Sequence, residues 1–327
     1  MKYNKWTLGL AAVGAVSLAS VTQAEESNAV QTMLSSTTLS GYVNTSIHWN
    51  PGTGNSSDAT VGDLDGSDNS NPLSRVPAYA FNSPGKSDGF NLNVVNLTLE
   101  KPLDVQDQWA AGYLIDIIAG PDAVGFNSAG GGGDVGLKQA YVALRAPIGN
   151  GLDLKLGTFD TIIGYEVFHG GSNPNYTRSW GYTIEPTQHT GVLASYRVND
   201  IVGFSFGVAN TWDPGINTRS GIESSKTYMA SVTVTAPEDA GVLAGSTLYA
   251  GIVNGLPGGH RSDRITSYYT GGTLATPIQG LNVGMALDHV TRGDSGEANR
   301  DHATAVGLYA SFAATEKLTL HTRGEWA

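Results

Sequence analysis

The feature that most constrains this chain is a repeated alternation of apolar with polar or small side chains, with a period of two residues. From Leu39 to Trp49, the odd positions are mostly apolar and the even positions are polar or small, and the same pattern recurs over 109–118, 202–208 and 281–288. Successive side chains of an extended strand point to opposite faces, so each segment predicts a β-strand with one apolar face. After residue 24, no run of about 18 apolar residues occurs, so we expect no transmembrane helix.

The alternating segments number about 13. They lie near residues 37–49, 90–100, 108–118, 135–145, 151–160, 190–198, 201–211, 226–236, 242–253, 264–276, 281–291, 302–313 and 318–326. Single-chain bacterial barrels close with even strand numbers, and the alternation here continues to Trp326. We therefore expect a C-terminally incomplete barrel whose full form has 14 to 16 strands or more.

The connections between these segments are alternately short and long. The short ones cover 147–151, 198–200, 237–241, 277–280 and 314–317, and the long ones cover 50–88, 119–133, 161–188, 213–225, 255–263 and 292–301. Short turns at one end and long loops at the other are typical of a transmembrane antiparallel β-barrel, which is the all-β fold we predict. A soluble β-sandwich also alternates, but its exposed faces usually gather Lys and Glu, which are scarce here.

The N-terminus predicts export. Residues 1–24 have a basic start with Lys2 and Lys5, an apolar stretch and a small-residue exit at Ala24, which indicates a signal peptide. A periplasmic segment over 25–36 and the barrel over 37–327 would follow, in the outer membrane of a Gram-negative-type cell. Cleavage removes two lysines and no acid, so the formal charge changes from -11 to -13. The absence of cysteine excludes a disulfide scaffold, and the acidity argues against a nucleic-acid partner.

Several stretches carry a family resemblance. They are LSGYVNTS from Leu39, NLTLEKP from Asn96, QAYV from Gln139, APIGNG from Ala146, GTF from Gly157, IGYE from Ile163, NYTRS from Asn175 and EPTQHTG from Glu185. In these stretches the chain resembles the OmpL-like β-barrel porin family, also called β-barrel porin type 2. The resemblance implies an outer-membrane porin.

A barrel of about 16 strands encloses an aqueous channel, whereas about 8 strands would be filled by side chains. We therefore expect a water-filled channel for passive diffusion of small hydrophilic solutes or ions, with outer-membrane lipid as its surroundings, no cofactor, and a homotrimer as one expected assembly. Strand parity gives the expected pore-lining residues: Tyr42, Asn44, Asp116, Tyr141, Arg145, Asp153, Lys155, Arg197, Asp288 and Arg323.

Two alternatives use different chemistry. A non-conducting structural or adhesin barrel would have a blocked interior. An outer-membrane lipid hydrolase would need a nucleophile, and Ser205 does stand in the G-x-S-x-G motif from Gly203 to Gly207. That serine should lie on a turn from strand to helix, but the alternation continues through Val208, so we expect no enzyme.

The long connection 161–188 is aromatic and charged. By its place after the fifth strand it is the candidate constriction loop, by analogy with porins whose loop at that position folds into the channel; the alternative is an ordered extracellular loop. Its candidate residues are Glu166, His169, Tyr176, Arg178 and Glu185. The two acids outnumber Arg178, which predicts a modest cation preference.

Metal sites have little support. The seven histidines include no H-E-x-x-H pair, so no metal is expected. Asp63, Asp65 and Asp68 resemble part of a calcium loop, but no Glu follows at the required distance. A solvated acidic loop is the favoured interpretation, and weak Ca²⁺ binding is the alternative.

Overall fold

The computed structural model describes residues 36–48, 89–104, 109–123, 135–222, 224–259, 263–293 and 301–327. Thirteen antiparallel strands form one sheet in which each strand pairs with its neighbours in chain order. The strands are β1 (Thr38–His48), β2 (Gly89–Lys101), β3 (Ala110–Ala119), β4 (Val135–Ala146), β5 (Leu152–Asp160), β6 (Gln188–Arg197), β7 (Val202–Ala209), β8 (Thr227–Thr235), β9 (Thr247–Gly255), β10 (Ile265–Ala275), β11 (Leu281–Arg292), β12 (Asp301–Ala313) and β13 (Thr319–Trp326).

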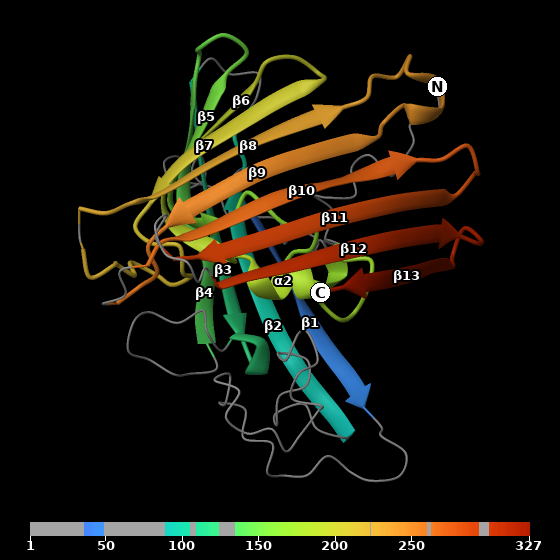
Figure 1. The fold of residues 1–327 in the computed structure, drawn as a ribbon, viewed down its shortest axis with the longest axis horizontal. Coiled ribbons are helices and arrows are strands. Elements are labelled where there is room, and N and C mark those ends of the chain that lie inside the picture. The colour runs from blue at the N-terminus through green and yellow to red at the C-terminus, as the bar shows by residue number, and fades with distance from the viewer. Residues whose placement is uncertain are drawn as a thin grey trace, which may run out of the picture.

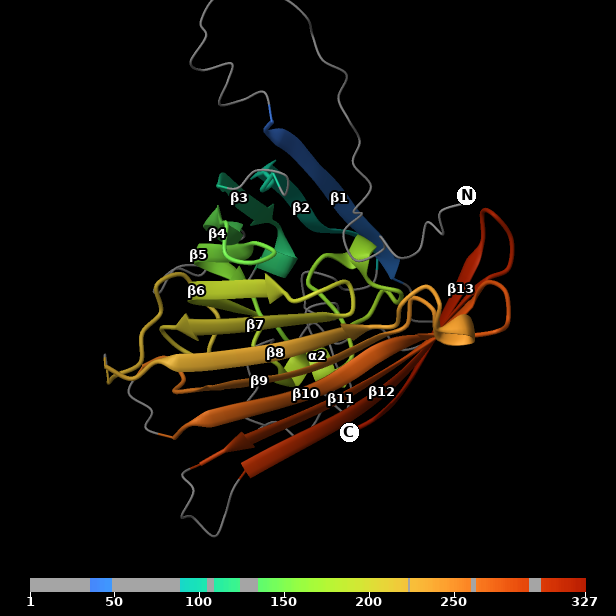
Figure 2. The same ribbon diagram turned by 90° about the horizontal axis from the view of Figure 1, so that it is seen from above.

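The sheet curves strongly, and its concave side encloses the helical segment α2 (Trp180–Ile184) (Figures 1 and 2). Three short 3-10 turns complete the described structure: η4 (Pro121–Ala123), η5 (Gly170–Ser172) and η6 (Gly241–Leu243). Within the described ranges, no helix is both long and apolar enough to cross a bilayer.

The sequence predictions of strand number and order are confirmed. Each expected strand is present, with ends that differ by at most two residues except at β9. That strand begins at Thr247 rather than near 242, because residues 241–243 turn in η6 before the strand starts. The signal peptide over 1–24, nearly all of the 25–36 segment and the acids Asp63, Asp65 and Asp68 lie outside the described residues.

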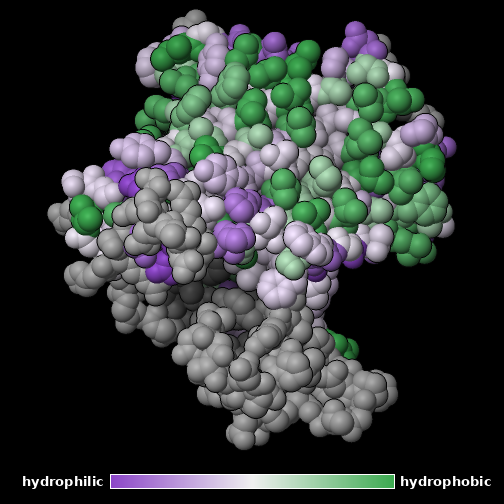
Figure 3. Space-filling view, viewed as in Figure 1, coloured by the Kyte–Doolittle hydropathy of each residue, from purple (hydrophilic) through white to green (hydrophobic). Residues whose placement is uncertain are grey.

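The two faces of the sheet differ as the alternation predicts. Phe206 is 61% exposed on the convex face, whereas Ser205 points to the concave face and lies within hydrogen-bonding distance of Ser195, 2.9 Å between hydroxyl oxygens. Hydrophobic residues gather on the face that Figure 3 shows. An apolar convex face and a polar concave face suit a sheet with lipid outside and water inside.

Two β-bulges change the parity of the concave face. Asn44 and Thr45 of β1 pair with Val94 and Leu92, so Asn93 is an extra residue in β2. Asp116 and Ile117 of β3 likewise pair with Gln139 and Leu137, so Lys138 is the extra residue in β4. Asn93 is fully buried and Lys138 nearly so. The bulges therefore add inward-facing side chains on neighbouring parts of the wall.

The difference between faces gives a direct test. Phe206→Arg should reduce the free energy of folding into lipid vesicles by about 2–4 kcal/mol if Phe206 lies near the bilayer midplane, because the guanidinium would then enter hydrocarbon. Ser205→Arg should cost little, since that side chain faces the concave side. The heat-modifiable folded fraction on a denaturing gel measures both, and equal loss in the two variants would contradict the assigned faces.

Candidate functional site

The connection between β5 and β6, residues 161–187, runs along the concave side of the sheet rather than away from it. Its first part packs in an apolar cluster with the wall, where Ile163 is 5% exposed. Tyr165 stacks on Tyr309 of β12 with ring centroids 4.0 Å apart. Gly284 of β11 makes room for this ring, because a Cβ there would lie 2.0 Å from the Tyr165 hydroxyl. We call residues 161–187 the inward loop.

The middle of the inward loop is bound to the first three strands. His169 lies between two partners, with Nε2 at 2.8 Å from Oδ2 of Asp116 and Nδ1 at 2.9 Å from the hydroxyl of Tyr42. The amide of Asn93, the bulge residue of β2, donates to the hydroxyl of Tyr176 at 3.0 Å. These contacts fix the loop against β1, β2 and β3.

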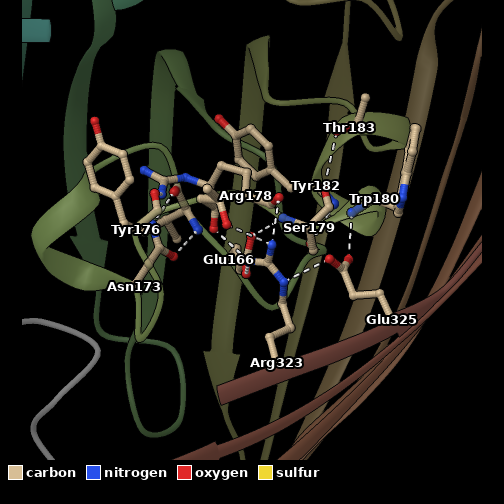
Figure 4. A network of polar contacts seen from close by, with 12 residues as sticks. Glu166, Asn173, Tyr176, Arg178, Ser179, Trp180, Tyr182, Thr183, Arg323 and Glu325 are labelled. Atoms are coloured by element: carbon tan, nitrogen blue, oxygen red, sulfur yellow. Dashed lines mark hydrogen bonds and ion pairs between the residues drawn. The ribbon is translucent and has the colours of Figure 1, made fainter. Parts of the chain in front are cut away.

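A second attachment comes from the opposite end of the sheet. The guanidinium of Arg323 in β13 donates to Oε1 of Glu166 at 2.9 Å, to the carbonyl and hydroxyl oxygens of Thr177 at 2.5 and 3.0 Å, and to the carbonyl oxygen of Arg178 at 3.0 Å. Glu325, two residues on, accepts from the backbone N–H of Trp180 at 2.7 Å (Figure 4). The inward loop therefore bridges β1–β3 and β13.

The buried charges of the loop are held by specific partners. The side chain of Glu166 is completely buried, and its second oxygen accepts from the N–H of Ser179 at 2.6 Å. Arg178 is 2% exposed and donates to the carbonyl oxygens of Tyr176 and Phe168. Burial lowers the pKa of Arg178 from its ordinary value, and the nearby Tyr182 and Glu166 oppose that shift. An ion buried without such partners would be costly, so these bonds fix the loop conformation.

Two acids meet beneath the end of α2. Glu185 follows this helix and is 8% exposed, while Asp288 in β11 is 4% exposed and hydrogen-bonds Glu185. The pKa of Glu185 is raised well above its ordinary value, first by burial and then by the charge of Asp288 and the hydrogen bond to it.

Another part of the concave side is open. A hollow of about 770 Å³ lies against β5–β8 near the short turns, and both polar and apolar residues line it, among them Ser195, Ser205 and Phe204. At its edge, Nη1 of Arg145 donates to both carboxylate oxygens of Asp153, at 2.8 and 2.9 Å. Arg197 also lines the hollow, and within the described residues its side chain has no hydrogen-bond or ion-pair partner.

The expected pore-lining residues fall into two groups. Five of them contact or lie beside the inward loop: Tyr42, Asn44, Asp116, Asp288 and Arg323. Three others line or border the hollow: Arg145, Asp153 and Arg197. The remaining two, Tyr141 and Lys155, contact each other. The ammonium group of Lys155 lies over the ring of Tyr141, 4.6 Å from its centroid.

The expected loop residues Glu166, His169, Tyr176, Arg178 and Glu185 all form part of this contact system. Sequence analysis missed Asn93, Lys138, Ser179 and Glu325. The shared parity of Glu325 with Arg323 could have indicated that Glu325 points inward. No comparable signal exists for Asn93 and Lys138, because bulges interrupt the alternation.

The other chemistries considered from sequence have less support. Ser205 lies within the continuous strand β7, not on a turn into a helix. In the part of the chain that the structure describes, no three His, Asp or Glu side chains are grouped so that they could hold a metal ion.

Together, the strand order, the short and long connections, the apolar convex face and the loop across the concave side define a porin-like β-barrel protein. The sequence pattern of the family described as "Putative beta-barrel porin-2, OmpL-like" matches residues 36–327. The chain belongs to this family, as the resemblance indicated, and the family consists of porin-like proteins of the outer membrane.

Three solved structures are similar at low identity. The outer membrane channel DcaP of Acinetobacter baumannii is 9% identical with a TM-score of 0.44, and the match covers 71% of this chain and 66% of that one. The trimer form of OmpT, an outer membrane protein of Vibrio cholerae, is 9% identical with a TM-score of 0.37 and coverages of 71% and 79%. OccAB4 of A. baumannii is 10% identical with a TM-score of 0.37 and coverages of 67% and 56%. Among curated proteins, none matches the chain in sequence.

The attachment of the inward loop to β13 can be tested by removing Arg323. Arg323→Ala should lower the free energy of unfolding by roughly 3–5 kcal/mol, because it leaves the carboxylate of Glu166 buried and uncompensated. Adding Glu166→Gln should recover part of the loss. Urea unfolding in lipid vesicles, followed by tryptophan fluorescence, measures both.

Arg292 provides the control. It pairs with Asp263 at 3.8 Å, and both side chains are more than one-third exposed, so Arg292→Ala should cost about 0–1 kcal/mol. If Arg323→Ala cost no more than Arg292→Ala, the Arg323 contacts would not hold the loop.

Proposed function

We propose that the protein is an outer-membrane porin that lets small hydrophilic solutes or ions diffuse passively, with the inward loop as its constriction. One observation carries the proposal: the loop is held across the polar concave side of a sheet whose convex face is apolar. Such a sheet separates lipid from water, and a fixed loop in the water-filled space limits what passes.

The attachments of the loop support its role as the constriction. Its attachments lie on strands at both ends of the sheet, through Asp116 and Tyr42 on one side and Arg323 and Glu325 on the other. A loop held at several points is suited to size selection, while a loop that fills the whole interior would suit the alternative of a structural or adhesin barrel. The open hollow beside Ser195 and Ser205 favours the channel.

Conductance distinguishes these alternatives. The protein reconstituted in a planar bilayer should give discrete conductance steps, and Arg323→Ala should increase the step size, because the loop loses its attachment to β13. A non-conducting barrel would give no steps with the intact chain. Arg292→Ala, which removes an exposed ion pair, is the matched control and should leave the step size unchanged.

The charge preference of the channel should depend on groups that are open to water. The cation preference expected from sequence rests on Glu166, which is bonded to Arg323, and on Glu185, whose pKa is raised by burial. Compensated or protonated acids exert little field on a passing ion. Arg197 should act more strongly on a passing ion, because it lines the hollow without a partner among the described residues. The exposed Asp200 of the β6–β7 turn also borders the hollow.

Removing the charge of Arg197 should therefore shift selectivity toward cations. In a salt gradient, Arg197→Gln should move the reversal potential in the cation-selective direction. Lys317→Gln removes the same charge from the exposed β12–β13 turn and should have a smaller effect. Equal shifts in both variants would indicate that total charge, and not the hollow, determines selectivity.

The assembly and surroundings follow from the same proposal. Outer-membrane lipid covers the apolar convex face, and a homotrimer is the proposed assembly, as in the trimer form of OmpT. No cofactor takes part in passive diffusion.

A further inference from the structure

The contact between Glu185 and Asp288 joins the end of α2 to the wall at β11. The two carboxyl groups are buried and hydrogen-bonded to each other. A carboxylate can only accept a hydrogen bond, so this contact requires a proton on one of the two acids. The inward loop is therefore attached to β11 through a shared proton.

The surroundings offer the pair little other compensation. Glu166 and Tyr269 face both carboxyl groups, and Tyr165 and Tyr309 face Glu166. Arg323 is bonded to Glu166 and Glu325. Arg178 donates to loop carbonyl oxygens. Oδ1 of Asp288 is buried and has no hydrogen-bond partner within the described residues. A second negative charge at this contact would thus be opposed by burial and by its neighbours.

The backbone of α2 lies directly on this pair. A Cβ at Gly181 would be 2.2 Å from Oδ2 of Asp288, so the helix and the carboxyl group are in close contact. Repulsion between Glu185 and Asp288 can be relieved if this helix moves away from β11. We propose that the Glu185–Asp288 contact is a proton-operated latch, which holds the inward loop against β11 in acid and releases it as the pH rises.

The direction follows from proton linkage. In the released loop, Glu185 would have its ordinary pKa of 4.5, whereas in the latched loop its pKa is raised by burial and by Asp288. The latched state therefore binds the proton more tightly. The equilibrium therefore favours the latched loop most strongly below about pH 4.5. As the pH rises from there to the raised pKa, the equilibrium constant for latching falls by up to about tenfold per pH unit.

Cysteine labelling measures this release directly, because the chain contains no cysteine. Ser179→Cys places a thiol at a loop position that is 4% exposed, and Asp239→Cys places one in the exposed β8–β9 turn. The full chain in lipid vesicles is treated with a water-soluble maleimide between about pH 5 and pH 9. The ratio of the two labelling rates corrects for the general increase of thiolate with pH and should rise with pH.

Three variants, each added to the Ser179→Cys chain, locate the cause. Glu185→Gln keeps a hydrogen-bond donor without a titrating group, so the ratio of labelling rates should no longer change with pH. Asp288→Asn tests the same contact from the wall and should also remove the pH response. Glu238→Gln makes the same change in an exposed turn and should leave the pH response intact.

A pH response that survives both Glu185→Gln and Asp288→Asn would overturn the latch. A labelling ratio that changes at constant pH on addition of EDTA would overturn it as well, because a cation and not a proton would then join the carboxyl groups. The latch regulates the proposed channel and rests on that function, but labelling does not require conduction. Absence of conductance steps with a normal labelling response would reject the channel alone.

Discussion

The structure depends on one constraint: in hydrocarbon, every backbone N–H and C=O group must find its partner within the protein. A sheet in which each strand pairs with the next meets this constraint along its length, and the thirteen strands are paired in this way from β1 to β13. Successive side chains of a strand point to opposite faces of the sheet. Apolar residues such as Phe206 therefore face the lipid, and polar residues such as Ser205 face the concave side.

That polar concave side makes the inward loop stable where it lies. Glu166 and Arg178 are buried there with hydrogen-bonded partners, and Arg323 reaches the loop from the wall. Apolar packing adds to these bonds, since Ile163 and Tyr165 contact a wall that contains small residues such as Gly284. The loop is therefore an interior element with its own core, held by both polar and apolar contacts.

The alternation predicted the number, order and faces of the strands because a period of two leaves a direct trace in sequence. The path of the inward loop left a weaker trace: its ordinal position offered only an analogy, and its partners are distant, with Glu166 and Arg323 separated by 157 residues. Bulges erase parity locally, so Asn93 and Lys138 could not be assigned to the concave face. The roles of the candidate residues in conduction stay predictions, since neither parity nor contact geometry measures flow.

The large sequence separation between Glu166 and Arg323 also has a consequence for the order of folding. Contacts between distant residues form late, because the chain between them must first be organised. The inward loop belongs to the β5–β6 connection but cannot complete its bonds until β13 is in place. The concave space thus stays accessible to water until β13 has formed, and the closing of the loop is a late step of assembly.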